Sequence, residues 1–344
     1  MRLTATVVAT MTIDIQIHSD EQAFELRSWK ELFAADPARH VFSTPEWNRV
    51  WWEEFSAGKE LIVLEMTRSG DPFAIVPLYR KEEDGRSILR FVGGIDLTDY
   101  LGPICRPEDR HEVATQLVAW LRSNDEWDEF DAHNMPVPLH FGEALVERAD
   151  AWGFDFQLEE EETAAVLMLP ASYDDYLASL DSKERHELKR KRRRIGREHP
   201  DAKIRTSTPE TLEEDLKTFV GMHRGAEGMK GHFMKPEIAT FFVRVARAFM
   251  PLGWLCLDFL EIGDAAVASC FGFEIEKKMY LYNSAFEIEA RRLSPGLILV
   301  SQQIEAAIER DFEVFDFLRG PERYKYQLGA EAVPLNNVRV MAPS

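Results

Sequence analysis

Cysteine is scarce in this sequence of 344 residues. Only Cys105, Cys256 and Cys270 are present, their number is odd, and no two have the C-x-x-C spacing of a metal-binding pair. The sequence therefore argues against a disulfide framework and against a structural zinc site. The nine histidines are scattered and form no H-E-x-x-H motif, so we expect no metal centre.

Long apolar runs and an excess of positive charge are also missing. No run reaches the about 18 apolar residues that a membrane-spanning helix needs. The opening MRLTATVVAT is a short apolar patch that ends before Asp14 without a cleavage region, which argues against a signal peptide and predicts a cytoplasmic protein. The net charge of −19 disfavours a whole-surface nucleic-acid binder and broad adhesion to anionic lipid.

What the sequence does contain is typical of a globular α/β (α+β) protein. Hydrophobic residues make up 45% and charged residues 29%, and the length suggests two domains. Predicted strands and helices alternate through the chain twice, with a break at Pro170, so we expect halves at 1–169 and 170–344. The main expected helices are 21–35, 45–55, 108–122, 139–152, 173–198, 209–224, 236–249 and 295–310, and the main expected strands are 61–66, 73–79, 88–92, 164–169, 254–262, 265–275, 278–284 and 314–318.

The most informative stretch is 279–329. A strand leads to Arg291 and Arg292, and then to Ser294, Pro295 and Gly296 at the start of an amphipathic helix. Ser294 is a suitable N-cap, Pro295 fits the first helical position, and Gly296 allows close approach to the backbone. Amides and arginines at a helix start form a candidate pyrophosphate cradle. The alternative is an ordinary capped helix in which the Ser294 side chain occupies one amide.

After this helix, the expected strand ends in a polar cluster between Arg319 and Lys325. Sites in open α/β sheets lie beyond the carboxyl ends of strands, and this position holds a carboxylate, a phenol and cationic groups within a few residues.

These motifs together resemble a known family. They are similar to the CelD-type acetyltransferase domain of the GNAT superfamily, which is related to FemAB-type aminoacyl transferases. The segments that carry the resemblance are the SPG helix start with FDFLRGPERYK at 315–325, FSTPEWNRVWWEEF at 42–55 and LTDYLGPI at 97–104. The resemblance covers about residues 40–335. It implies two tandem GNAT-like halves, each a mixed, mostly antiparallel sheet flanked by helices, with acetyl-CoA or another acyl-CoA bound by the second.

The resemblance also implies positions for the cofactor. The cofactor strand would be 281–286, with Asn283 and Ser284 near the thioester. The pyrophosphate loop would be 291–296, with Arg291, Arg292, Ser294 and backbone amides of Gly296, Leu297 and Ile298. The chain departs from the superfamily pattern Q/R-x-x-G-x-G/A, and Pro295 has no N–H to donate.

Transfer of an acyl group to an amine needs a base, a polarised carbonyl and an acid for the leaving thiolate. Our candidates are Asp316 or Glu322 as the base and Tyr324 as the acid. Arg323 or Lys325 could hold an anionic group of the acceptor. The alternatives are a salt-bridged strand residue for Asp316 and a capping turn for Tyr324 and Lys325.

Residues 183–197 carry a net charge of +7, whereas the whole chain is acidic. A solvated helix face is the usual explanation, but so local an excess favours contact with an anion. Arg185 and Lys189 lie one helical turn apart and could bind one phosphate. The glycine-rich segment 222–233, with His223, Arg224, Glu227, Lys230 and His232, is either a lid over the acceptor or a simple connector.

Three hypotheses remain at this stage. The first is an acyl-CoA-dependent N-acyltransferase that acts on the amino group of a small molecule. The acceptor would be a sugar nucleotide or a cell-envelope or exopolysaccharide precursor, and it could carry negative charge. The second is a FemAB-like transferase that uses aminoacyl-tRNA, which the basic segment and the imperfect cofactor loop favour. The third is a non-catalytic binding protein that has kept the fold.

Overall fold

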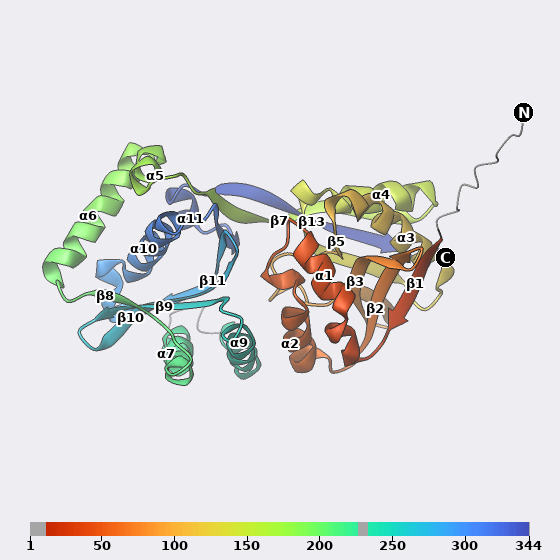
Figure 1. The fold of residues 1–344 in the computed structure, drawn as a ribbon, viewed down its shortest axis with the longest axis horizontal. Helices are drawn as coiled ribbons and strands as arrows, with labels where there is room; N and C mark the ends of the chain where they lie inside the picture. Colours follow the sequence, from red (N-terminus) through yellow and green to blue (C-terminus); the bar gives the residue numbers. More distant parts are fainter. Residues whose placement is uncertain (1–11, 226–232, 344) are drawn as a thin grey trace, which may run out of the picture. The chain divides into compact units, whose positions relative to one another are not determined.

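The computed structural model describes residues 12–225 and 233–343, which form two compact units (Figure 1). The first unit ends at Glu161 but also includes the C-terminal residues from Asn336, and the second unit runs from Glu162 to Leu335. The boundary expected at 169/170 therefore differs from the observed one. Strands β7 (Asp155–Met168) and β13 (Glu331–Met341) each contain residues of both units, which a linear sequence pattern does not indicate.

The first unit is a mostly antiparallel sheet with strand order β1-β2-β3-β4-β6-β13, while the short β5 pairs with β3. Strands β4 and β6 are parallel neighbours, and helix α3 lies between them in the chain. Its elements are β1 (Ile13–His18), α1 (Arg27–Ala35), α2 (Pro45–Phe55), β2 (Lys59–Arg68), β3 (Asp71–Glu83), β4 (Arg86–Phe91), β5 (Ile104–Cys105), α3 (Arg110–Ser123), β6 (Glu129–Pro136) and α4 (Phe141–Ala151).

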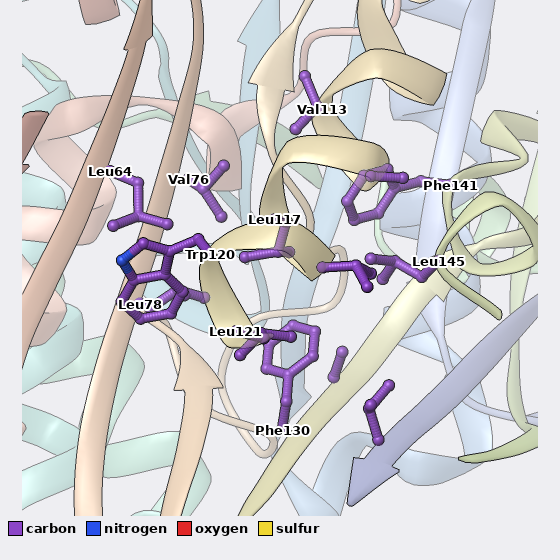
Figure 2. Close-up of a cluster of buried hydrophobic side chains, with 14 of the residues drawn as sticks. Leu64, Val76, Leu78, Val113, Leu117, Trp120, Leu121, Phe130, Phe141 and Leu145 are labelled. Atoms are coloured by element: carbon purple, nitrogen blue, oxygen red, sulfur yellow. The ribbon is translucent and has the colours of Figure 1, made fainter. Parts of the chain in front are cut away.

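The core of the first unit lies between its sheet and helices α3 and α4. Figure 2 shows Leu117 and Leu121 of α3 among side chains from neighbouring strands and from α4, including Val76 and Phe141. Val338, from β13, belongs to the same buried cluster, so the end of the chain completes this core. Burial of such aliphatic and aromatic side chains contributes about 1.5–3 kcal/mol each before conformational entropy is counted.

A charged network also lies within the first unit. His133 contacts Asp131 through Nε2 at 2.9 Å and Glu161 through Nδ1 at 2.6 Å, and Asp131 also accepts hydrogen bonds from Arg90 and Asn337. Burial by itself lowers the pKa of His133, but the hydrogen bonds and charges of the two carboxylates outweigh burial and raise the pKa to about 9. His133 is therefore a cation at neutral pH, held between β6 and β7.

The second unit repeats the arrangement of the first. Its strand order is β7-β12-β11-β10-β9-β8, with β11 and β12 parallel and connected through helix α10. Its elements are α5 (Tyr173–Ser179), α6 (Ser182–Glu198), β8 (Lys203–Thr206), α7 (Leu212–Gly225), α9 (Pro236–Phe249), β9 (Leu255–Ile262), β10 (Ala265–Ile275), β11 (Lys278–Phe286), the 3-10 helix η5 (Ile288–Leu293), α10 (Pro295–Glu309), β12 (Val314–Arg319) and α11 (Arg323–Gln327).

The predicted helix 173–198 is wrong as a single element, because the chain turns between α5 and α6. Leu180 has extended backbone angles and its side chain is buried in the core of the second unit. The Arg185 guanidinium donates to the carbonyls of Leu177 and Ala178 at 3.3 and 3.2 Å, which satisfies groups that the end of α5 leaves unpaired. The expected helix 21–35 is likewise divided, into a 3-10 turn at Glu21–Glu25 and α1.

Strand β11 is irregular at the position that shapes the second unit. Phe271 of β10 pairs with Asn283 but Gly272 pairs with Leu281, so Tyr282 is an extra residue that forms a β-bulge. A Cβ atom at Gly272 would lie 2.3 Å from the carbonyl oxygen of Tyr280, which explains the glycine. The bulge changes the direction of the last part of β11.

Beyond this point β11 and β12 diverge. Their described parallel pairs run from Lys278 with Val314 to Tyr280 with Asp316, while β11 continues to Phe286 and β12 to Arg319. The carboxyl-terminal parts of these two parallel strands are therefore separated, which leaves space between them. In the described part of the chain, no helix is long and apolar enough to cross a membrane.

Candidate functional site

A cavity of about 350 Å³ lies at the start of α10. We call it the α10 cavity. Its lining comes from four segments of the second unit: α6, the end of β11, the η5–α10 connection with the first turns of α10, and α11. The lining residues are Lys191, Ser284, Phe286, Arg291, Ser294, Pro295, Gly296, Leu297, Val300, Tyr324 and Gln327.

The helix start in this cavity is open rather than capped. Within residues 233–343, the Ser294 side chain makes no capping hydrogen bond, and its backbone is left-handed with φ 57°. The predicted capping role of Ser294 is therefore wrong. The first amide of α10 with a backbone partner is that of Ile298, which donates to the Ser294 carbonyl at 3.1 Å. The preceding amides, of Gly296 and Leu297, remain at the positive end of the helix dipole.

Gly296 keeps the approach to these amides clear. A Cβ atom at this position would meet only Phe286 Cδ1, at an ordinary distance of 3.5 Å, so the protein itself does not require glycine there. The exposed Arg291 guanidinium and the Lys191 ammonium add positive charge to the same lining. Amides, a helix dipole and cations directed at one cavity suit a phosphate-bearing ligand. These residues fit the pyrophosphate-containing cofactor expected from the sequence.

A second cavity of about 200 Å³ occupies the split between β11 and β12, and we call it the β11–β12 cavity. Its lining comes from the bulged part of β11, the end of β12, α11, the buried His223 of α7, and Phe233. The lining residues are His223, Phe233, Leu281, Tyr282, Asn283, Ser284, Phe317, Arg319, Glu322, Tyr324 and Lys325.

Tyr324 and Ser284 line both cavities. The Ser284 side chain lies next to the Tyr324 hydroxyl. Burial and then the Glu322 carboxylate raise the pKa of Tyr324 above its ordinary value, against a smaller opposite effect of the Ser284 hydroxyl. The phenol is therefore protonated at neutral pH and can donate a proton to a group in either cavity. Asn283, one residue earlier, accepts the Ser284 amide at 2.8 Å through Oδ1.

Lys325 has a structural role in this site. Its side chain is 4% exposed, and its ammonium donates to the carbonyls of Leu318, Arg319 and Gly320 and lies 2.9 Å from Glu322. These contacts fix the turn from β12 to α11, which carries Tyr324. The ammonium thus has several protein partners, whereas the sequence suggested an acceptor-binding cation.

Asp316, a candidate for the base, has a structural role. Its carboxylate is buried and accepts the Leu318 amide at 2.8 Å, and Leu318 itself has a left-handed backbone with φ 60°. Asp316 thus stabilises the bend where β12 loses its regular pairing with β7. It is not among the described residues that line either cavity, so Glu322, which is half exposed, is the carboxylate of the β11–β12 cavity.

The other predicted residues lie around the site in different roles. Arg292 is exposed, and its carbonyl accepts the Arg194 guanidinium of α6 at 3.0 Å. Ile298 is buried in the core, and Arg323 is exposed on α11. Arg185 binds the end of α5, as described above, whereas Lys189 is exposed on the next turn of α6, so the structure does not bring these two side chains to a shared ligand.

Several lining residues were not identified from the sequence. Lys191 was hidden within a run of nine cations, and nothing in that run distinguishes the residue that faces the α10 cavity. Tyr282 enters the β11–β12 cavity because of the bulge, which has no clear local signal. His223, named only as part of a loop, is a buried residue of α7 whose ring lies 4.7 Å from that of Phe219. Arg224, of the same predicted loop, is exposed near the end of α7, whereas Glu227, Lys230 and His232 lie outside the described residues.

Comparison with known proteins agrees with this geometry. The family model described as an acetyltransferase (GNAT) domain matches residues 182–326, which contain nearly all of both cavities. No curated protein matches the chain. A crystal structure of FemX is similar with a TM-score of 0.66 at 12% identity, covering 94% of this chain and 96% of that one. A conserved protein of unknown function from Bacteroides thetaiotaomicron VPI-5482 has a TM-score of 0.60 at 12% identity, covering 95% and 100%.

These findings confirm the expected fold class. The chain has two halves, each a mixed, mostly antiparallel sheet flanked by helices, and residues 182–326 of the second unit match the model of a GNAT acetyltransferase domain. The structural similarities at 12% identity concern the fold alone.

Proposed function

We propose that this protein is an acyl-CoA-dependent N-acyltransferase of the CelD-like type, working in the cytoplasm. Acetyl-CoA or another acyl-CoA binds in the α10 cavity, and a small amine binds in the β11–β12 cavity. The observation that supports this most directly is that both cavities share Tyr324 and Ser284. Two ligands that meet at a protonated phenol can exchange an acyl group and a proton at one place.

The α10 cavity supplies the cofactor contacts. The amides of Gly296 and Leu297 and the Arg291 guanidinium bind the pyrophosphate, and Phe286 and Val300 contact the apolar part of the carrier. When bound, acyl-CoA supplies an acyl group activated as a thioester. The diverging end of β11, around Asn283 and Ser284, would supply the polar groups that polarise that carbonyl.

Tyr324 serves as the general acid. Its raised pKa keeps the phenol protonated at neutral pH, so its O–H would be available to hydrogen-bond to the thioester sulfur as negative charge develops there and to pass its proton to the departing thiolate. The neighbouring Ser284 hydroxyl helps to orient the phenol. The Lys325 contacts described above keep the turn before α11 in place, so the hydroxyl is held between the two cavities.

The acceptor side suits an amine. Glu322 presents a carboxylate that attracts an ammonium and accepts its proton, directly or through water, and the Lys325 ammonium 2.9 Å away holds that carboxylate in place. Phe233, Tyr282 and Phe317 provide apolar and aromatic walls. A cavity of about 200 Å³ accommodates a monosaccharide or amino-acid-sized group, such as the amino group of a sugar nucleotide or of an envelope or exopolysaccharide precursor.

Calorimetric titration with acetyl-CoA, followed by an assay of thiol release with a panel of amino sugars and amino acids, tests the proposal. We expect wild-type binding and turnover with at least one amine. Tyr324→Phe should lower kcat about 100-fold with unchanged cofactor affinity. Tyr326→Phe is the matched control, because Tyr326 is on the same short helix but does not line the described cavities. No binding at millimolar acetyl-CoA would refute the proposal.

The aminoacyl-tRNA alternative rests on the outward face of α6. Lys183, Lys189 and Arg193 are exposed there, in a chain that is otherwise strongly acidic. Filter binding with charged tRNA separates the two functions: retention of tRNA without acetyl-CoA binding would favour the alternative. If the protein were a non-catalytic binder, neither ligand would support turnover, and Tyr324→Phe would leave its biological role unchanged.

A further inference from the structure

Three arginines of helix α6 contact other segments of the second unit. Arg185 binds carbonyls at the end of α5, Arg192 binds Glu305 of α10 and the Tyr173 hydroxyl, and Arg194 binds the Arg292 carbonyl of η5. The bonds of Arg192 to Glu305 and of Arg194 to the Arg292 carbonyl hold the helix against α10 and η5, which form part of the α10 cavity. The basic sequence is therefore only partly a solvated face.

Lys191 lies on the side of α6 that these bonds orient. It precedes Arg194 by three residues and so occupies the same helix face, which is directed at η5. Lys191 is partly buried and lines the α10 cavity, as Arg291 does. Lys189, two residues earlier, is exposed and does not line the described cavities.

The helix start leaves a need for such a cation. Pro295 has no amide hydrogen, and the Ile298 amide already donates to the Ser294 carbonyl, so only the Gly296 and Leu297 amides remain for a ligand. Two amides and a solvent-exposed arginine do not balance the negative charge of a diphosphate. The Lys191 ammonium in the cavity lining supplies the missing charge with a strong, charge-assisted hydrogen bond.

We propose that Lys191 is the specificity-determining residue of the α10 cavity, which binds a phosphate of the acyl carrier. This inference rests on the proposed function. With Lys191 in place the cavity takes thioesters of a diphosphate-bearing carrier in preference to thioesters of phosphate-free pantetheine. The basic helix thereby compensates for the amide that Pro295 cannot provide.

Calorimetry with coenzyme A and with pantetheine tests the inference on wild type, Lys191→Met, Lys191→Gln and Lys191→Arg. We expect either neutral variant to bind coenzyme A about tenfold more weakly, the size of one charge-assisted hydrogen bond, and to bind pantetheine as wild type does. Lys191→Arg should restore most of the affinity. Lys189→Met, a matched loss of charge on the same helix, should leave both affinities unchanged.

The outcomes separate the two claims. If wild type binds coenzyme A and the neutral Lys191 variants bind it equally well, or if Lys189→Met causes the same loss, the role of Lys191 is refuted while the proposed function stands. If wild type binds no coenzyme A, the proposed function fails and the inference fails with it. Urea unfolding of each variant verifies that the compared proteins are folded.

Discussion

Gly296→Ala separates what α10 needs to fold from what it needs to bind a ligand. The new Cβ would meet only Phe286 Cδ1 at 3.5 Å, and the backbone at Gly296 is not in the left-handed region. Because alanine favours the helix over glycine, we expect the free energy of unfolding to rise by about 0.5–1 kcal/mol. The methyl group, however, occupies the space through which a phosphate reaches the Gly296 and Leu297 amides.

The same substitution should weaken cofactor binding at least about tenfold, because 1.4 kcal/mol of steric conflict or lost hydrogen bonding corresponds to that factor. Urea unfolding and calorimetric titration with acetyl-CoA measure the two effects on one protein. Gly221→Ala in α7 is the matched control: a Cβ there meets nothing within 4 Å, so stability should rise similarly without any change in affinity. A more stable Gly296→Ala protein with unchanged acetyl-CoA affinity would refute the cradle at the start of α10.

Three further predictions concern the packing around the site and the first unit. The folded-state pKa of His133 is raised to about 9, so its contribution to the free energy of unfolding is complete below the unfolded-state pKa of about 6.5 and is lost as pH rises through 9. Between pH 6 and 9.5, the free energy of unfolding of wild type should therefore fall relative to that of His133→Asn, by at most about 3 kcal/mol. An equal pH profile in both proteins would contradict this. Gly272→Ala places a methyl group 2.3 Å from the Tyr280 carbonyl, so urea unfolding should show a loss of about 3 kcal/mol, and a neutral effect would exclude the bulge geometry. Lys325→Met removes the partner of three carbonyls and of Glu322 and should lower the free energy of unfolding by about 3 kcal/mol. Arg323→Met, at an exposed position, should change it by less than about 0.5 kcal/mol, and similar unfolding midpoints for the two variants would disprove the structural role of Lys325.

Local sequence patterns were sufficient for most elements. Pro236 and Pro295 mark the first residues of α9 and α10 as expected, and α9 ends at the predicted Phe249. The β9–β10 hairpin turns at Gly263 and Asp264, again as expected. These features depend on neighbours in the chain, because proline sets φ and removes a donor, and glycine permits the tight turn.

Predictions from the sequence were wrong where the structure depends on contacts between residues far apart in the chain. The helix expected over 173–198 breaks because Leu180 is drawn into the core and Arg185 satisfies the exposed carbonyls of α5. Asp316 has the residue type of a base, but its burial against the Leu318 amide makes it part of the β12 bend. Residue type and spacing indicate which chemistry is available, whereas burial decides which carboxylate reaches a ligand.

The sequence alone determined the alternation of strands and helices, the start of α10, and the presence of Ser284, Gly296, Glu322 and Tyr324 near one another along the chain. Those properties come from local backbone preferences and short spacings, which a linear chain carries with it. Only the tertiary structure decided that Ser294 leaves the helix start open and that Lys191 faces it. The split of β11 from β12, which puts Tyr324 between two cavities, depends on a bulge and on pairing between strands far apart in the chain, and no local pattern encodes such contacts.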